Sequence, residues 1–244
     1  MGLLPTVKTP PKEDVRDLTI LLYGRPKIGK SSFASGADGA IFLATEPGLN
    51  HLDVYQTPVA KWAEFLAACA ELAAGKHDFR TVVVDTIGNA YQFCQDHVCA
   101  ANKWTHPADA GYGKGFAAVN NEFRRAIGKL AALPYGLIMI AHDKALTDEK
   151  TGAVRMVPAL SAGAREAVVA LADLVLYAET ERVRDGEKTT TIRVLRTKPA
   201  TEYEAGDRTG RLPDPLILPN TPDPSENWGT FVAAFRGVTE SEAA

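Results

Sequence analysis

Residues 18–32 read LTILLYGRPKIGKSS, and this stretch decides the fold of the chain. The apolar residues 18–23 predict a buried strand, and residues 24–31 fill every fixed position of the pattern G-x-x-x-x-G-K-[ST]. Residues 31–34 are compatible with a helix. A glycine-rich turn between a strand and a helix N-terminus binds phosphate groups through its backbone amides. The stretch therefore predicts an α/β fold that binds a nucleoside triphosphate with Mg²⁺.

The residue types in this loop match specific tasks. Gly24 and Gly29 let the backbone curl close to the phosphates. Lys30 is expected to neutralise the β and γ phosphates, and Ser31 to ligate Mg²⁺. The expected nucleotide-binding residues are Gly24, Arg25, Pro26, Lys27, Ile28, Gly29, Lys30, Ser31 and Ser32.

Polar residues end three further apolar runs. Asp85 ends the run 81–85 and is expected to hold Mg²⁺ through a water molecule. Glu46 follows the run 40–45 and is placed to orient and deprotonate an attacking water. His142 follows residues 138–141 and could hydrogen-bond the γ-phosphate. Each residue could also be an ordinary solvated strand end. Because open α/β sheets bind ligands at the carboxyl ends of their strands, the functional interpretation is favoured.

Apolar strands alternate with helical segments along the chain, which indicates a mostly parallel sheet flanked by helices. An apparent hairpin then adds antiparallel strands at the C-terminal end, with a turn at Asp185-Gly186. The core strands are expected at 18–23, 40–45, 81–85, 136–141 and 173–178, the hairpin strands at 174–184 and 188–196, and helices at 61–74, 116–133 and 228–235.

The domain boundaries follow from composition. Residues 1–16 are rich in proline and predict an extended arm that packs on a neighbour or stays loose, residues 17–235 one ATPase-type domain, and residues 236–244 a frayed tail. Residues 199–226 are expected to be irregular. The aromatic residues of the two long helices, Phe116 among them, are expected in the core.

Composition excludes several protein classes. The formal net charge of −3 argues against a global basic surface for nucleic acid. Three cysteines fit a reducing compartment, and the spacing of Cys94, His97 and Cys99 matches no standard zinc motif. The sequence has no signal-peptide pattern and no run of eighteen apolar residues. We therefore expect a cytoplasmic protein that does not bind a membrane.

The loop, Asp85, strand-end Glu46 and His142, and a late hairpin ending in Arg196-Thr197-Lys198 together resemble the RecA-like branch of P-loop ATPases. The chain is most similar to short phage-type RecA-like ATPases of single-strand annealing or recombination, often described as AAA-type ATP-binding proteins. The resemblance covers roughly residues 17–220 and implies ATP and Mg²⁺ as cofactors, and the cytoplasm of a bacterial host cell if the gene is phage-encoded.

The resemblance also implies roles for individual residues. Glu46 corresponds to the catalytic glutamate, and His142 to a polar γ-phosphate sensor. Arg196 and Lys198 fall where such proteins present cations to the ATP of a neighbouring subunit, although both could be exposed strand-end residues. Arg208 and Arg211 are further candidates for this role. A homo-oligomer, either a ring or a short filament, would then be the active form.

Two loops at the strand ends are expected to contact single-stranded DNA. Aromatic rings could stack on bases while lysines follow the phosphates, or both kinds of residue could simply be solvated or anchor the loops. The first loop, residues 94–115, contains Lys103, Trp104, His106, Tyr112 and Lys114. The second, residues 143–163, contains Lys144, Lys150 and Arg155, with Arg165 just beyond it.

The leading hypothesis is an ATPase that assembles on single-stranded DNA and promotes annealing or strand exchange. Its partners would be other copies of the same chain and a single-strand-binding protein. A small-molecule or nucleotide kinase shares the phosphate loop but needs an acceptor pocket and a basic lid, for which only residues 182–211 could serve. An ATP-gated scaffold such as a helicase loader is the non-enzyme alternative. Stimulation of phosphate release by DNA or by a nucleoside monophosphate distinguishes the two enzymes.

Overall fold

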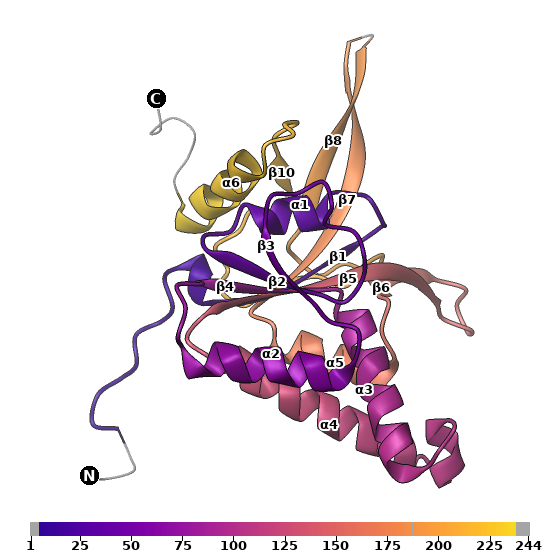
Figure 1. Cartoon of the computed structure of the whole chain (residues 1–244). Coiled ribbons are helices and arrows are strands. Elements are labelled where there is room, and N and C mark those ends of the chain that lie inside the picture. The colour runs from indigo at the N-terminus through magenta and orange to yellow at the C-terminus, as the bar shows by residue number, and fades with distance from the viewer. Residues whose placement is uncertain (1–4, 187, 238–244) are drawn as a thin grey trace.

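A computed structural model describes residues 5–186 and 188–237. A single ten-stranded sheet forms its centre, in the order β10-β8-β7-β1-β5-β4-β2-β3, with β6 paired to β5 and β9 to β7 (Figure 1). The strands are β1 (Thr19–Gly24), β2 (Ala40–Ala44), β3 (Tyr55–Pro58), β4 (Thr81–Asp85), β5 (Gly136–Thr147), β6 (Val154–Pro158), β7 (Leu174–Asp185), β8 (Lys188–Arg196), β9 (Gly206–Asp207) and β10 (Leu216–Leu218).

Helices cover both faces of the sheet. In Figure 1, α2, α3, α4 and α5 lie below it, and α1 and α6 lie above it. The helices are α1 (Lys30–Ser35), α2 (Trp62–Ala74), α3 (Ile87–Asn102), α4 (Lys114–Ala131), α5 (Ala162–Leu171) and α6 (Pro224–Arg236), with short 3₁₀ turns η1 (Val15–Asp17) and η2 (Pro107–Ala110).

Strand β1 shows why the sheet is buried on both faces. Leu21 and Tyr23 pack into the core beneath the sheet, whereas Ile20 and Leu22 pack into the core above it. Successive side chains of a strand point to opposite faces, so a nearly continuous apolar run fits a strand covered by helices on both sides. Strands β1, β2, β3, β4, β5 and β7 run parallel; β8 pairs antiparallel with β7, and β10 pairs antiparallel with β8. The predicted fold class is confirmed.

The order of the strands positions the site. Strand β1, which leads into the phosphate loop, lies between β5 and β7, and β5 separates it from β4. The parallel register pairs Gly24 with His142, and Ala44 with Asp85. The carboxyl ends of β1, β2, β4 and β5 therefore meet at one edge of the sheet.

Several expected loops are regular structure. The proposed loop 143–163 is mostly a β-hairpin, since β5 continues to Thr147 and β6 returns from Val154. This ribbon is largely exposed, so it lacks the apolar alternation that marks a core strand. The expected loop 94–115 begins inside α3, which continues to Asn102 because Val98 and Cys99 remain buried.

Some other elements, or their first residues, were not predicted from the sequence. All four residues of edge strand β3 are exposed, so no apolar run signals it. The segment 199–226 contains the short strands β9 and β10. Helix α6 begins at Pro224, four residues before the expected Trp228, and the side chain of Asp223 caps it by accepting a hydrogen bond from the Ser225 amide. Asp followed by Pro is a helix-start signal that the sequence contained.

The expectation that Phe116 belongs to the core is wrong. Its side chain is 40% exposed and contacts the His106 ring edge-on. Phe116 lies in the first turn of α4, beside η2, where α3 and α4 extend away from the sheet (Figure 1). Other aromatic residues of these helices, such as Trp62, Phe65 and Phe123, are fully buried as expected.

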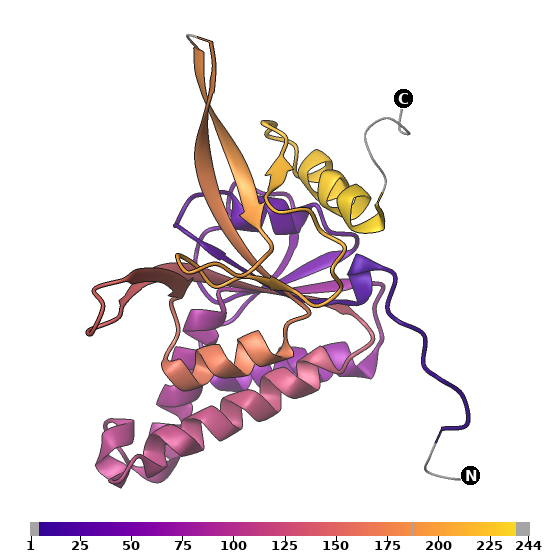
Figure 2. The same ribbon diagram turned by 180° about the vertical axis from the view of Figure 1, so that it is seen from behind.

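The observed boundaries of the domain differ slightly from the expected ones at both ends of the chain. Packing begins slightly before residue 17, because Val15 is buried in the upper core and Asp14 caps its 3₁₀ turn. Residues 5–13 extend away from the sheet and the helices that cover it (Figure 2). Helix α6 ends at Arg236, and residues 238–244 of the predicted tail lie outside the described residues.

Candidate functional site

A cavity of about 540 Å³ opens at the carboxyl ends of β1, β2, β4 and β5. It brings together residues that are far apart in the sequence, from the phosphate loop, the β2–β3 connection, β4 and β5. The lining residues are Pro26, Lys27, Gly29, Lys30, Ser31, Ser32, Glu46, Pro47, Gly48, His51, Asp85, Ile140 and His142. Lys30, Ser31, Asp85, Glu46 and His142 therefore converge as the sequence predicted.

The glycines of the loop have different reasons to be glycine. Gly24 has φ +154°, and a Cβ there would lie 2.4 Å from the Ala178 carbonyl oxygen of β7. Gly24 thus permits the close approach of a neighbouring strand, whereas the sequence suggested only an approach to phosphate. Gly29 has φ +97°, and a Cβ there would lie 2.9 Å from Nη1 of Arg193. Both glycines are required by the backbone and its neighbours.

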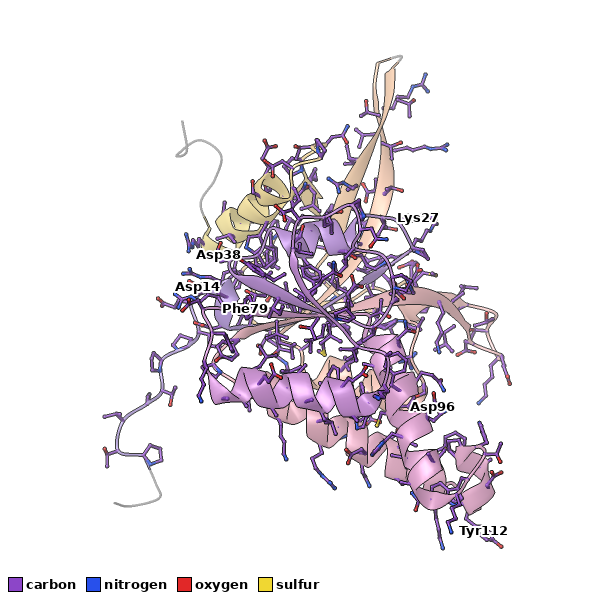
Figure 3. All side chains as sticks on the ribbon, in the orientation of Figure 1. Asp14, Lys27, Asp38, Phe79, Asp96 and Tyr112 are labelled. Atoms are coloured by element: carbon purple, nitrogen blue, oxygen red, sulfur yellow. The ribbon has the colours of Figure 1, made fainter. Side chains whose placement is uncertain are left out.

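The phosphate loop has backbone amide donors without a partner. Among the described residues, the amides of Lys27, Ile28 and Gly29 donate to no backbone or side-chain acceptor. Lys27 and Gly29 line the cavity, and Figure 3 shows Lys27 beside α1. Arg25 and Pro26 are exposed on the same loop. Unpaired amides beside a cation form an environment that favours an anionic ligand such as phosphate.

Lys30 is buried, at 6% exposure, and its ammonium donates to the carbonyl oxygens of Gly24 (2.7 Å) and Arg25 (2.8 Å). Burial lowers the pKa of Lys30, while the nearby carboxyls of Asp85, Asp143 and Glu46 act in the opposite direction. Phosphate oxygens would replace two neutral carbonyl acceptors by charged ones, which strengthens such hydrogen bonds. The local chemistry therefore fits a triphosphate.

Ser31 and Asp85 are in direct contact. The Ser31 hydroxyl donates to Oδ2 of Asp85 at 2.6 Å, so both expected metal-binding residues lie at one point of the cavity. Burial raises the pKa of Asp85, and this outweighs the hydrogen bond from Ser31, which lowers it. Hydroxyl and carboxylate oxygens are ligands that suit Mg²⁺, which usually also keeps waters and phosphate oxygens as ligands. These two residues fit a Mg²⁺ ion bound together with a triphosphate.

The described residues include no cluster of three or more His, Cys, Asp or Glu side chains suited to a metal ion. Cys94 and Cys99 are buried, and His97 between them is exposed, so these three side chains do not converge. A magnesium ion that takes most of its ligands from phosphate and water needs no such cluster.

Glu46 has a polar neighbour at each carboxylate oxygen, but a hydrogen bond at Oε2 alone. Asn89 donates from Nδ2 to Oε2 of Glu46 at 3.1 Å, and Nε2 of His142 lies 3.5 Å from Oε1. Glu46 and His142 remain partly exposed, at 32% and 38% of their side chains, so both can reach a ligand in the cavity. Asn89 was not among the predicted site residues. Its one sequence signal is its place four residues after Asp85.

Two polar atoms beside this group lack partners. Nδ1 of His142 and Oδ2 of Asp143 are buried and make no hydrogen bond with the described residues. Buried polar atoms are normally paired, and a catalytic role is one of the reasons for an exception. The base of the β5–β6 hairpin, where both residues lie, thus retains hydrogen-bonding capacity next to the cavity.

The predicted trans-acting cations lie away from the cavity of their own chain. Arg196 pairs with Glu179 (2.6 Å) and with Glu181, and its guanidinium stacks over Tyr203. Lys198 is exposed just beyond β8. Arg208 donates to the Ala170 carbonyl and Arg211 stacks over Phe235. The proposed role of these cations in a neighbouring subunit stays a prediction.

The candidate DNA-contacting residues separate into exposed and anchored groups. Tyr112 is fully exposed at the far tip formed by η2 and the start of α4 (Figure 3), with Lys103 and Lys114 also exposed there. Trp104, in contrast, is half-buried against the lower core. His106 caps η2 by accepting a hydrogen bond from the Ala108 amide.

On the β5–β6 side most candidate cations already have partners. Lys144 donates to the Leu160 carbonyl and Arg155 to the Tyr203 carbonyl. Arg165 on α5 lies 3.7 Å from Glu204. Lys150, near the turn of the hairpin, is exposed.

None of the described helices is both long and apolar enough to cross a bilayer. In comparisons with known proteins, residues 16–209 match the family model described as an AAA domain. The matched range contains the phosphate loop, Glu46, Asp85 and His142. No curated protein matches the chain.

Proposed function

Because the chain belongs to the AAA domain family of P-loop ATPases, we propose that it hydrolyses ATP with Mg²⁺ and acts on single-stranded DNA in phage-type recombination or annealing. The observation that carries the proposal is the convergence of Lys30, Ser31, Asp85, Glu46 and His142 on one cavity. A phosphate-binding loop alone would support nucleotide binding. The addition of a partly exposed carboxylate, oriented by a hydrogen bond from Asn89 to one of its oxygens, supports hydrolysis.

In the proposed reaction, a water oxygen attacks the γ-phosphorus while Glu46 accepts a proton from that water. The bond between the γ-phosphorus and the bridging oxygen breaks, and ADP leaves with the electron pair. Lys30 and the loop amides hold the phosphates in place. Ser31 and Asp85 would hold Mg²⁺, which supplies charge neutralisation between the β and γ phosphates. His142 lines the same cavity, with Nε2 3.5 Å from Oε1 of Glu46, and would hydrogen-bond the γ-phosphate.

The test of hydrolysis uses two variants of the full chain. K30A removes the cation of the loop and should abolish ATP binding, so turnover is lost as well. E46Q preserves the shape of the side chain and should bind ATP normally but stall hydrolysis, with a loss of about 100-fold or more. Binding of a fluorescent ATP analogue and steady-state phosphate release measure the two properties separately. Normal turnover by either variant would overturn the assignment.

Single-stranded DNA is proposed as the effector because the ring of Tyr112 is fully exposed. In the sequence, Tyr112 lies between the exposed residues Lys103 and Lys114. Tyr112 has φ +46° and lies between Gly111 and Gly113, which also have positive φ. A non-glycine residue in this conformation is uncommon, and such conformations are concentrated at functional positions. Stacking of a base on an aromatic ring contributes about 1–3 kcal/mol and tolerates any sequence.

We therefore expect a long single-stranded oligonucleotide to stimulate phosphate release, with stimulation that weakens at high salt. Y112A should weaken DNA binding about 10-fold and leave ATP hydrolysis without DNA unchanged. Y55A is the control, because Tyr55 is also a largely exposed tyrosine but lies on edge strand β3, outside the two proposed DNA-contacting loops. Absence of any DNA effect would favour an ATP-gated scaffold that needs a partner protein.

A kinase is less well supported. The segment 182–211, which would have to form its lid, includes the outer part of the β7–β8 hairpin and the chain that follows. No described residue of this segment lines the cavity. The assembly of several copies into a ring or filament, with Arg196 or Lys198 reaching the ATP of a neighbour, remains part of the proposal and is tested by the dependence of turnover on protein concentration.

A further inference from the structure

Asn89 connects the carboxylate of Glu46 to the buried start of helix α3. It belongs to the first turn of α3, which follows directly on β4 and Asp85. Its Nδ2 atom lies 3.1 Å from Oε2 of Glu46 and 3.3 Å from the Thr45 carbonyl oxygen. One amide group therefore contacts both the side chain of Glu46 and the backbone immediately before it.

The helix that carries Asn89 is fixed relative to the end of β2. The side chain of Thr45 donates to the Thr86 carbonyl at 2.8 Å and accepts from the Thr86 amide at 2.7 Å. Ile87 and Ala90, which flank Asn89 in the same turn, are fully buried. The donor and the carboxylate thus rest on two elements joined by buried hydrogen bonds, a condition for accurate positioning.

The two oxygens of Glu46 have unequal surroundings. Oε2 accepts a hydrogen bond from a neutral amide, which can neither give up nor take up a proton in the working pH range. Oε1 faces His142 on the cavity side at 3.5 Å. With Oε2 held by Asn89, the plane of the carboxylate is fixed and Oε1 is left to accept a proton from water.

We propose that Asn89 is a positioning residue for ATP hydrolysis, which holds the Glu46 carboxylate in the orientation that activates water. The inference rests on the proposed function of Glu46 as the base. Asn89 itself exchanges no proton and forms no bond to the nucleotide. Because a misplacement of about 1 Å in a catalytic group can cost about 100-fold in rate, loss of this contact should affect turnover far more than binding.

Three substitutions test whether Asn89 acts as a hydrogen-bond donor or only fills space. N89D preserves the shape but replaces the donor with a carboxylate that repels Glu46, N89A removes the side chain, and N89Q retains an amide on a longer arm. If Asn89 acts as a donor, turnover should fall about 100-fold in N89D, about 10-fold in N89A and less in N89Q. If it only fills space, N89D should be closest to the wild type.

The measurements are kcat for phosphate release, the Kd for Mg-ATP and the melting temperature of the full chain. We expect the largest fall in kcat in N89D, a smaller fall in N89A and the smallest in N89Q. The Kd for Mg-ATP should change by less than about twofold, because a residue that only orients the catalytic base does not contribute to ground-state binding. Q92A is the matched control, because Gln92 is exposed on the same helix and bonds only Asp96 among the described residues. Should N89A lose stability, the comparison of N89D with N89Q carries the test.

The outcomes distinguish this inference from the proposed function. Stalled E46Q together with wild-type kcat in N89A and N89D would overturn the role of Asn89 alone. Active E46Q would overturn the role of Glu46 and this inference with it. Equal losses of Kd and kcat in all three Asn89 variants would make Asn89 a structural residue.

Discussion

Two groups of charged residues in this protein are built in opposite ways. In the phosphate cavity, Lys30 and Asp85 are buried, yet neither has an oppositely charged partner within 4 Å among the described residues. Burial shifts the pKa of each against its charged form. At the base of the β7–β8 hairpin, in contrast, Arg196 pairs with two glutamates of its own chain.

The difference separates a site prepared for a ligand from a site that stabilises the fold. A triphosphate would give Lys30 the opposite charge it lacks, and Mg²⁺ would do the same for Asp85, so ligand binding relieves a cost that the free protein carries. Arg196 already has its counter-charges within its own chain. The nearby Arg193 also serves the fold, although its acceptors are neutral: its Nη2 donates to two carbonyl oxygens and to Oδ1 of Asn227.

The largest expected effect on stability belongs to Arg193. R193M should lower the free energy of unfolding by about 3 kcal/mol, because the carbonyls of Pro219 and Thr221 and the amide of Asn227 lose their donor. Urea unfolding measures the change. R182M, on the exposed part of the same hairpin, is the control and should leave stability unchanged. Unchanged stability with lost ATP binding would place Arg193 in the ligand site and break the comparison.

A smaller effect is expected from R196A, which should lower the free energy of unfolding by about 2 kcal/mol because Glu179 and Glu181 then repel each other without a counter-charge. If Arg196 serves only the fold of its own chain, turnover per folded molecule should be little changed. K198A is the matched control, since Lys198 is exposed. If R196A instead keeps its stability and loses turnover in a concentration-dependent way, Arg196 acts on a neighbouring subunit as the resemblance implied.

The smallest effect has the opposite sign. D85N should stabilise the nucleotide-free protein by about 1 kcal/mol at pH 7, because burial disfavours the ionised carboxyl. Burial raises the pKa of Asp85 in the folded protein above the ordinary value of 3.8, so its cost appears as the pH rises through that range. The stability difference between D85N and the wild type should therefore vanish below pH 3.8. Denaturant unfolding of both proteins across this range measures it.

The same substitution should abolish Mg-ATP hydrolysis, which links the two halves of the comparison. A residue that destabilises the free protein and is needed for activity is typical of a functional site. Loss of stability in D85N at pH 7 would show that the hydrogen bond from Ser31 outweighs the cost of burial, and the contrast between the two charged groups would then fail.

The predictable part of the fold was the part with strong local signals. Strand β4 has the bounds that its run of valines predicted, and β1 differs by one residue at each end. Strand β3 and the β5–β6 hairpin were missed because their side chains are mostly exposed, so pairing with a neighbouring strand, and not an apolar pattern, maintains them. Phe116 was misplaced because helical periodicity cannot show where a helix leaves the protein body.

The sequence by itself determined the phosphate loop, the parallel α/β core and the strand-end positions of Glu46, Asp85 and His142, because these depend on residue types at short, fixed spacings. The tertiary structure decided that Asn89 holds Glu46, that Gly24 makes room for Ala178, and that Arg196 pairs within its own chain. Such contacts join residues that are 17 to 154 positions apart. Their geometry depends on the order and register of the strands, which no local pattern encodes.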